Sequence, residues 1–158
     1  MEHYLFYSAM IDSCRQKSVL RILDVNLNRL REALRVIEEY VRFIDLHETL
    51  AAGFKGLRHA LQEIETGLGR EALIDSRDVE TDPFAQGNRP EELMRGDESD
   101  IVSANFKRAQ EAARVIEEYV KITNAPALSE KAKNIRFSLY ELEKKFMKQV
   151  INEQKRRA

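Results

Sequence analysis

The sequence predicts an all-α protein, and three observations support that prediction. Apolar residues recur at helical spacing, no segment alternates with the period of two that marks a strand, and one helical pattern occurs twice. Residues 24–43 and 103–122 are identical at 11 of 20 positions, and residues 55–65 are similar to residues 133–143. We therefore expect a helical bundle built from two repeated helical hairpins with pseudo-twofold symmetry.

The length and composition favour one domain spanning residues 1–158. Its first repeat covers about residues 19–66, a central loop covers residues 67–98, and the second repeat covers about residues 99–156. A net charge of −1 argues against a nucleic-acid partner, and no apolar run approaches the ~18 residues of a membrane span. The first residues lack a signal-peptide pattern, so a cytoplasmic protein is expected.

Cysteine and histidine usage narrows the chemistry further. Cys14 is the only cysteine, which excludes a disulfide framework and a cysteine metal site. The three histidines are scattered and form no HExxH or comparable cluster. The sequence therefore argues against a zinc enzyme and against a hydrolase of the Ser-His-Asp type.

The first repeat predicts two helices. The first should run from about Val19 to Ile44, with a short separate helix over residues 4–16 packed outside the bundle. The second should run from about His47 to Thr66, because the glycines that follow are natural helix stops.

The second repeat predicts two more helices. One should begin near Ser99 and end at about Thr123, before the helix-breaking Pro126. The last should begin after Ser129, a plausible N-cap, and continue to the basic C-terminus.

The central loop is longer than most structureless loops, which are usually functional or disordered beyond ~12–15 residues. A short helical turn is expected after Pro90, since proline suits a first helical position. Arg77, Asp78 and Asp82 occur together in this loop, so a lid or binding loop is favoured over a disordered linker.

Several polar residues repeated in both halves fall on apolar helix faces. On a helical wheel, Asn26 lies in the middle of the apolar arc and Arg29 lies at its edge. Asn105 and Arg108 repeat this arrangement in the second half. A buried polar group without a partner costs ~1–3 kcal/mol, so these positions need an explanation other than packing.

Two further arginines, Arg58 and Arg136, lie on the shoulders of their own apolar stripes. An arginine side chain offers a planar fork that matches phosphate, so the four arginines together predict an anion site. The alternative is that an arginine pairs with a carboxylate on a neighbouring helix and only fixes the bundle. For any single arginine both explanations are equally good, and for the duplicated set the anion site is favoured.

The remaining repeated charges predict an exposed stripe. Glu32, Arg35, Glu38 and Glu39 are spaced for pairs that stabilise an exposed helix by a few tenths of a kcal/mol each. Their identity in both repeats is also compatible with a contact between the repeats or with a homodimer interface. Glu38 and its counterpart Glu117 are only weak site candidates.

No glycine-rich phosphate loop of the GxxxxGK[ST] or GxGxxG type occurs, so a nucleotide would be held by side chains. Asp78 and Asp82 could carry Mg²⁺, which needs only one or two carboxylates besides phosphate oxygens.

Four segments together resemble the monofunctional hydroxymethylpyrimidine-phosphate kinases of thiamine biosynthesis, a small helical family often fused in front of thiamine-phosphate synthase. They are residues 21–43, 76–83, 103–121 and 135–144. The resemblance covers about residues 19–146 and is specific, because two similar helical runs flank the Arg-Asp-x3-Asp loop in order.

The chain departs from that family pattern in two places. Residues 1–18 have no counterpart in it, and the sequence Asp82-Pro83-Phe84 stands where Asp-Val-Gly is expected. The synthase domain is absent, so the resemblance implies a standalone form that could still contact thiamine-phosphate synthase.

The resemblance implies transfer of the γ-phosphoryl group of ATP to a pyrimidine phosphate, giving the diphosphate. The nucleophile would be a phosphate with a second pKa of ~6, so no strong base is needed. The residues that the resemblance assigns to this reaction are Arg29, Arg108, Arg58 and Arg136 as phosphate clamps, Asn26 and Asn105 orienting phosphate or the aminopyrimidine, Asp78 and Asp82 binding Mg²⁺, and Arg77 closing over the phosphates.

Two other classes of function remain open from the sequence. The chain could be a non-catalytic helical module that binds a thiamine-pathway phosphate or docks on the synthase. It could also be a structural bundle that oligomerises through its charged stripe. The enzyme is the favoured class.

Overall fold

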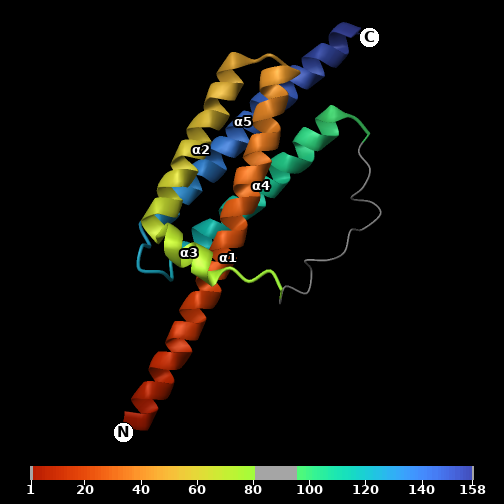
Figure 1. Ribbon diagram of the computed structural model, residues 1–158. Coiled ribbons are helices and arrows are strands. Elements are labelled where there is room, and N and C mark those ends of the chain that lie inside the picture. Colours follow the sequence, from red (N-terminus) through yellow and green to blue (C-terminus); the bar gives the residue numbers. More distant parts are fainter. Residues whose placement is uncertain (1, 81–95, 158) are drawn as a thin grey trace.

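The computed structural model describes residues 2–80 and 96–157, and every regular element in these residues is a helix (Figure 1). This confirms the all-α prediction. No helix among them is long and apolar enough to cross a membrane. In chain order the helices are α1 (Glu2–Phe43), α2 (Glu48–Leu68), α3 (Arg70–Ser76), α4 (Glu98–Val120) and α5 (Leu128–Arg157).

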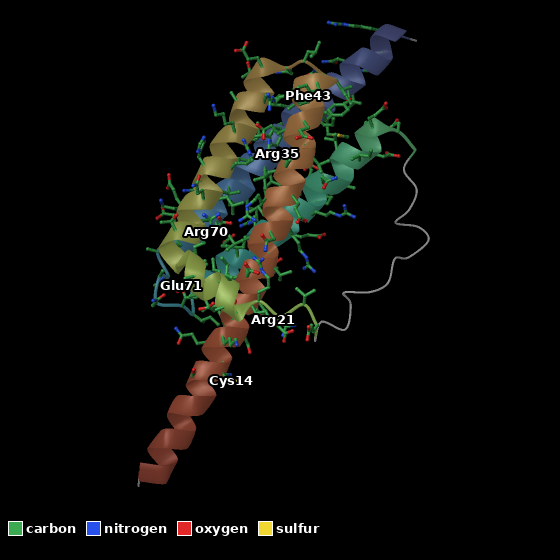
Figure 2. All side chains as sticks on the ribbon, in the orientation of Figure 1. Cys14, Arg21, Arg35, Phe43, Arg70 and Glu71 are labelled. Carbon is green, nitrogen blue, oxygen red and sulfur yellow. The ribbon has the colours of Figure 1, made fainter. Side chains whose placement is uncertain are left out.

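Helix α1 is continuous over 42 residues, so the prediction of a separate short helix over residues 4–16 is wrong. No glycine or proline interrupts this stretch, and a helix that has formed propagates through such a sequence. Its N-terminal part projects away from the other helices, and residues 13–18 are exposed (Figure 1). Cys14 lies on this projection (Figure 2).

Helix α2 begins one residue later than predicted, because His47 caps it. The Nδ1 atom of His47 accepts a hydrogen bond from the backbone N–H of Leu50 at 3.2 Å. The helix continues through Gly67 and ends at Leu68, where Gly69 takes a φ of 89° and turns the chain. Gly67 is a packing position, since a Cβ there would lie 2.8 Å from Leu128.

Helix α3 occupies part of the segment that was predicted to be a loop. It has seven residues and buries Leu73 and Ser76 while packing on α1. The short turn expected after Pro90 falls outside the described residues.

Helices α4 and α5 lie close to their predicted positions. The carboxylate of Asp97 caps α4 by accepting from the backbone N–H of Asp100 at 2.9 Å. The helix ends at Val120, three residues before the predicted Thr123. Ser129 lies inside α5 rather than at its N-cap, because that helix already begins at Leu128.

Helix α1 packs against α2, α3 and α4, and α5 completes the bundle by packing against α2 and α4. Helices α1 and α4 cross and run in opposite directions (Figure 1). Three fully buried rings, Phe54, Phe106 and Phe146, stack in sequence with centroid distances of 5.8 Å. Each buried ring contributes about 1.5–3 kcal/mol from the area it removes from water, so this stack helps to fix α4 against its neighbours.

Candidate functional site

A groove of about 620 Å³ lies between α1 and α4, and we call it the central groove. It is lined by five residues from each helix, and each has its counterpart at the sequence offset of 79. The five pairs are Asn26 and Asn105, Arg29 and Arg108, Glu32 and Glu111, Ala33 and Ala112, and Val36 and Val115.

The two asparagines are buried in the wall of the central groove, as the helical wheel predicts. Asn26 is 6% exposed and Asn105 is 7% exposed. Each side chain donates its Nδ2–H to the carbonyl oxygen four residues earlier, of Ile22 and Ile101 respectively, at 2.8 Å. Neither Oδ1 atom accepts a hydrogen bond from the residues that the structure describes, so each amide leaves an acceptor for a ligand.

Arg29 and Arg108 line the same groove, but both are exposed rather than buried at the edge of the apolar face. Neither guanidinium makes a hydrogen bond or ion pair with any described residue. Both cations are therefore available to an anion from solvent, and binding one would cost no hydrogen bond or ion pair with a described residue.

Glu32 and Glu111 also line the central groove, and the sequence reasoning placed them only on an exposed stripe. Like the two arginines, they form no hydrogen bond or ion pair within the described part of the chain. A signal for them exists in the sequence: Glu32 follows Arg29 by three residues, so the two side chains share a helix side. The walls thus carry two cations and two carboxylates.

Arg58 and Arg136 do not join this groove. The Nε atom of Arg58 lies 2.8 Å from the Oε2 atom of Glu38, and Arg136 donates from Nε to the Oε2 atom of Glu117 at 2.8 Å. The hydrogen bond to Glu117 raises the pKa of the Arg136 guanidinium above its ordinary value. Each of these two arginines therefore pairs with a carboxylate on a neighbouring helix, which was the alternative to an anion site.

The partners of these arginines correct another prediction. Glu38 and Glu117 are 3% and 5% exposed, although the wheel placed them on an exposed stripe. They are buried because α1 and α4 each pack against more than one helix, so a second side of each helix is covered. A buried carboxylate needs a cation, and Arg58 and Arg136 supply it.

A second groove, of about 840 Å³, adjoins the central groove and shares Arg29 and Glu32 with it. We call it the side groove; it runs along the first half of the bundled part of α1 and reaches residues 77–79. Arg77 lies in it and holds the buried Asp24 with two hydrogen bonds of 2.8 Å. These bonds raise the pKa of Arg77 above its ordinary value.

Asp78 also lines the side groove, and its surroundings do not favour the predicted metal role. Its carboxylate Oδ2 atom lies 3.3 Å from the Nη1 atom of Arg21, and its carbonyl oxygen accepts from Nη2 at 2.7 Å. Arg21 projects near the lower end of the bundled part of α1 (Figure 2). Asp82, the other predicted ligand, lies outside the described residues. No group of three or more residues able to hold a metal ion occurs in the described ranges.

An apolar groove of about 280 Å³ continues from the opposite end of the central groove, at Val36. Its walls come from the end of α1, including Tyr40 and Phe43, and from Ile101 and Val102 near the start of α4. Phe43 marks this end in Figure 2. A polar centre with charged residues on one side and apolar residues on the other suits a ligand that carries both a phosphate and a ring.

The fold and grooves define a small helical protein with a polar groove that is lined by counterparts from the two sequence repeats. The model of the ThiD2 family matches residues 21–145, and the chain belongs to that family. The matched region contains every lining residue of the central groove, whereas the projecting start of α1 precedes it.

Curated relatives of the chain carry the name thiamine-phosphate synthase. One from Thermosynechococcus vestitus is 46% identical over 123 residues, which is 78% of this chain and 34% of the relative. One from Gloeobacter violaceus is 42% identical over 81% of this chain and 36% of the relative. One from Nostoc punctiforme is 40% identical over 84% of this chain and 36% of the relative.

The chain thus spans about a third of the length of these relatives. No solved structure matches the chain significantly.

Proposed function

We propose that this protein is a kinase of thiamine biosynthesis that transfers the γ-phosphoryl group of ATP to 4-amino-5-hydroxymethyl-2-methylpyrimidine phosphate. The observation that carries the proposal is the pair of unpartnered guanidiniums, Arg29 and Arg108, in one groove. Membership of the ThiD2 family and similarity to proteins named thiamine-phosphate synthase support the thiamine pathway.

The groove suits the demands of this reaction. An oxygen of the pyrimidine monophosphate attacks the γ-phosphorus, the bond from that phosphorus to the β-bridging oxygen breaks, and ADP leaves with the electron pair. The attacking oxygen is already anionic near neutral pH, so no general base is required. The protein has to bring two polyanions together and neutralise the charge between them, and arginine guanidiniums serve this purpose in phosphoryl transfer.

The predicted roles of the other arginines change under this proposal. Arg58 and Arg136 fix the helices through buried glutamates, so we do not assign them to substrate. Arg77 is held in the adjoining side groove by two hydrogen bonds to the buried Asp24, so we assign it first to that carboxylate. Arg29 and Arg108 therefore carry the phosphate role.

Magnesium is part of the proposal, and Glu32 and Glu111 suit it better than Asp78. Both glutamates face the groove that holds the free arginines, whereas Asp78 is paired with Arg21. Two carboxylates together with phosphate oxygens make the ligand set that Mg²⁺ prefers. When bound, the ion would neutralise phosphate charge.

We further propose that the two sequence repeats form hairpins related by a pseudo-twofold axis through the central groove. The supporting observation is that all five lining residues of α1 have their repeat counterparts as the lining residues of α4. One shared site, rather than a separate site in each hairpin, follows from that arrangement.

A kinase assay tests the function. Purified protein is incubated with ATP, Mg²⁺ and the pyrimidine phosphate, with the free pyrimidine alcohol as a parallel substrate. We expect diphosphate from the phosphorylated substrate only, because the free alcohol leaves one guanidinium of the groove without its anion. Absence of turnover combined with thermal stabilisation by the same ligands would replace the kinase by a non-catalytic binding module. Absence of both effects would leave a structural bundle.

A further inference from the structure

The lining residues of the central groove follow a definite order along its length. Helices α1 and α4 are antiparallel, since residues 36–43 at the end of α1 border the apolar groove with residues 98–102 at the start of α4. Residues 19–20 of α1 correspondingly lie beside residues 122–123, just beyond the end of α4. Repeat counterparts therefore appear in opposite order along the two walls.

This order separates the amides from the charges. Asn26 lies towards the side-groove end and Asn105 towards the apolar-groove end, while Arg29 and Arg108 lie between them. From Asn26 to Val36, the last lining residue of α1, the helix rises about 15 Å, at about 1.5 Å per residue. The groove thus has two amide ends and a charged centre, in which two arginines and two glutamates lie.

The hydrogen bonds of the two amides fix what each can recognise. Because each Nδ2–H is donated to a backbone carbonyl four residues earlier, each Oδ1 is held as an acceptor. A phosphate oxygen is itself an acceptor, so the unpartnered Oδ1 atom does not favour phosphate. Its natural partner is an N–H group, which favours the heterocycle-orienting role over the phosphate-orienting role that the sequence allowed for Asn26 and Asn105.

Apolar side chains lie beside both acceptors. Val36 and Ile101 flank the end that holds Asn105, and Ile22 and Val25 line the side groove next to Asn26. A planar ring could pack on these side chains while its edge meets the amide oxygen. An acceptor at the edge with apolar groups beside it is a typical arrangement for an aromatic heterocycle.

We propose that the central groove holds two equivalent binding positions for phosphate esters of amino-substituted nitrogen heterocycles, with Asn26 and Asn105 each accepting a hydrogen bond from one exocyclic amino group. This inference rests on the proposed function and deepens it. Both substrates of the proposed kinase are of this class, since the acceptor is an aminopyrimidine and adenine carries an amino group on its six-membered ring. Their phosphates meet between Arg29 and Arg108.

The proposal has a consequence for the nucleotide donor. A base with an amino group can donate to the fixed Oδ1 atom, whereas a base with an oxo group at that position places two acceptors against each other. Leaving a buried acceptor unpaired is costly, and a single base-edge contact of this kind is worth about tenfold or more in discrimination. ATP and CTP should therefore bind better than ITP and UTP.

Calorimetric titration of the full chain tests this without turnover. ATP is compared with ITP, and CTP with UTP, each with Mg²⁺ and without the pyrimidine substrate. We expect at least about tenfold tighter binding of the amino member of each pair. Equal affinities within both pairs would overturn the inference, and this comparison needs no variant to fold.

Variants assign the two ends. In Asn26→Ala and Asn105→Ala, we expect one protein to lose the ATP-over-ITP preference. The other should lose the preference for the aminopyrimidine phosphate over its 4-oxo analogue. Asn134→Ala is the matched control, because Asn134 is exposed on α5 and lines none of the three grooves. Unchanged preferences in both groove variants, with circular dichroism confirming their fold, would also overturn the inference.

The outcomes separate this inference from the proposed function. Phosphorylation of the pyrimidine phosphate without any amino preference would leave the kinase standing and remove the role of the asparagines. An amino preference that disappears in one groove variant, without any turnover, would keep the recognition positions and remove the kinase.

Discussion

The residues shared by the two halves of the chain lie in two kinds of surroundings. In the central groove, counterparts from the two repeats line one cavity together. In the buried ion pairs they remain apart, with Glu38–Arg58 joining α1 to α2 and Glu117–Arg136 joining α4 to α5. Residues that are identical in the two repeats therefore occur both in a candidate site and in structural ion pairs. What distinguishes the candidate site is that the counterparts from the two repeats lie in the same groove.

The arginines of the two regions also differ in what they are free to do. Arg29 and Arg108 are exposed and have no partner in the described part of the chain, whereas Arg58 and Arg136 are committed to buried carboxylates. Of the two buried ion pairs, Glu117–Arg136 is the more enclosed. The Arg136 side chain is 14% exposed and its guanidinium lies 4.9 Å from the centre of the Phe137 ring, while the Arg58 side chain is 28% exposed.

The largest effect is expected at the enclosed ion pair. Arg136→Met leaves the buried Glu117 with the exposed Arg114 as its remaining partner among the described residues, and breaking such a pair costs about 3 kcal/mol. Urea unfolding should show this loss in the free energy of unfolding, and a smaller loss for Arg58→Met. Arg156→Met, exposed near the end of α5, is the control. The double variant Glu117→Leu/Arg136→Met should regain most of the stability, and a loss no greater than in the control would contradict the structural role.

The groove arginines should affect activity and not stability. For Arg29→Ala and Arg108→Ala we expect kcat/KM to fall about 100-fold, equivalent to about 2.7 kcal/mol of transition-state stabilisation, with little change in Tm. Steady-state assays and thermal melts measure the two effects. Arg42→Ala, an exposed position of α1 outside the central groove, should keep its activity. Full turnover in both groove variants would contradict the proposed role of Arg29 and Arg108 in binding phosphate.

The carboxylates of the central groove should set the magnesium requirement. Glu32→Gln and Glu111→Gln remove one charge each with little change of shape, and we expect the Mg²⁺ concentration for half-maximal activity to rise about tenfold. Magnesium titrations of the initial rate give this value. Asp78→Asn should leave it unchanged, because the Asp78 carboxylate is paired with Arg21. A higher Mg²⁺ requirement in Asp78→Asn, with none in the two glutamate variants, would instead support Asp78 as the metal ligand that the sequence predicted.

The smallest effect is expected at the cap of α4, outside both regions. A hydrogen bond from Ser99 lowers the pKa of Asp97 below its ordinary value. A carboxyl with a lower pKa in the folded protein stabilises it above the unfolded pKa, and this stability is lost as the pH falls through the folded pKa. Asp97→Asn keeps an N-cap acceptor without the charge. The difference in Tm between the wild type and Asp97→Asn at pH 7 should therefore shrink towards about pH 3. A difference that stays constant with pH would show that the charge of Asp97 does not stabilise the helix.

The features that the sequence predicted correctly depend on local periodicity. The helical wheel placed Asn26 and Asn105 on buried faces, and both are buried. Helices α2, α4 and α5 begin and end within a few residues of their predicted positions, because caps and glycines act locally. The short α3 was missed because seven residues are too few for a helical period to emerge.

The features that could not be predicted depend on which helices become neighbours. A wheel identifies one apolar face, but α1 packs against three helices, so it also buries Glu38. The wheel likewise placed Arg58 and Arg136 on shoulders without indicating that a carboxylate lies opposite each. Glu32 and Glu111 belong to a groove only because α1 and α4 cross, and that crossing is a tertiary fact.

The two alanines of the central groove decide how thick a ligand can be. Ala33 and Ala112 are each 2% exposed and carry only a methyl group into the space between the helices. Any longer side chain at either position would occupy volume that a ring or a phosphate needs, without altering a single charge. Shape and electrostatics can therefore be varied separately in this cleft, with its steric clearance set by two methyl groups and its potential set by four ionised side chains.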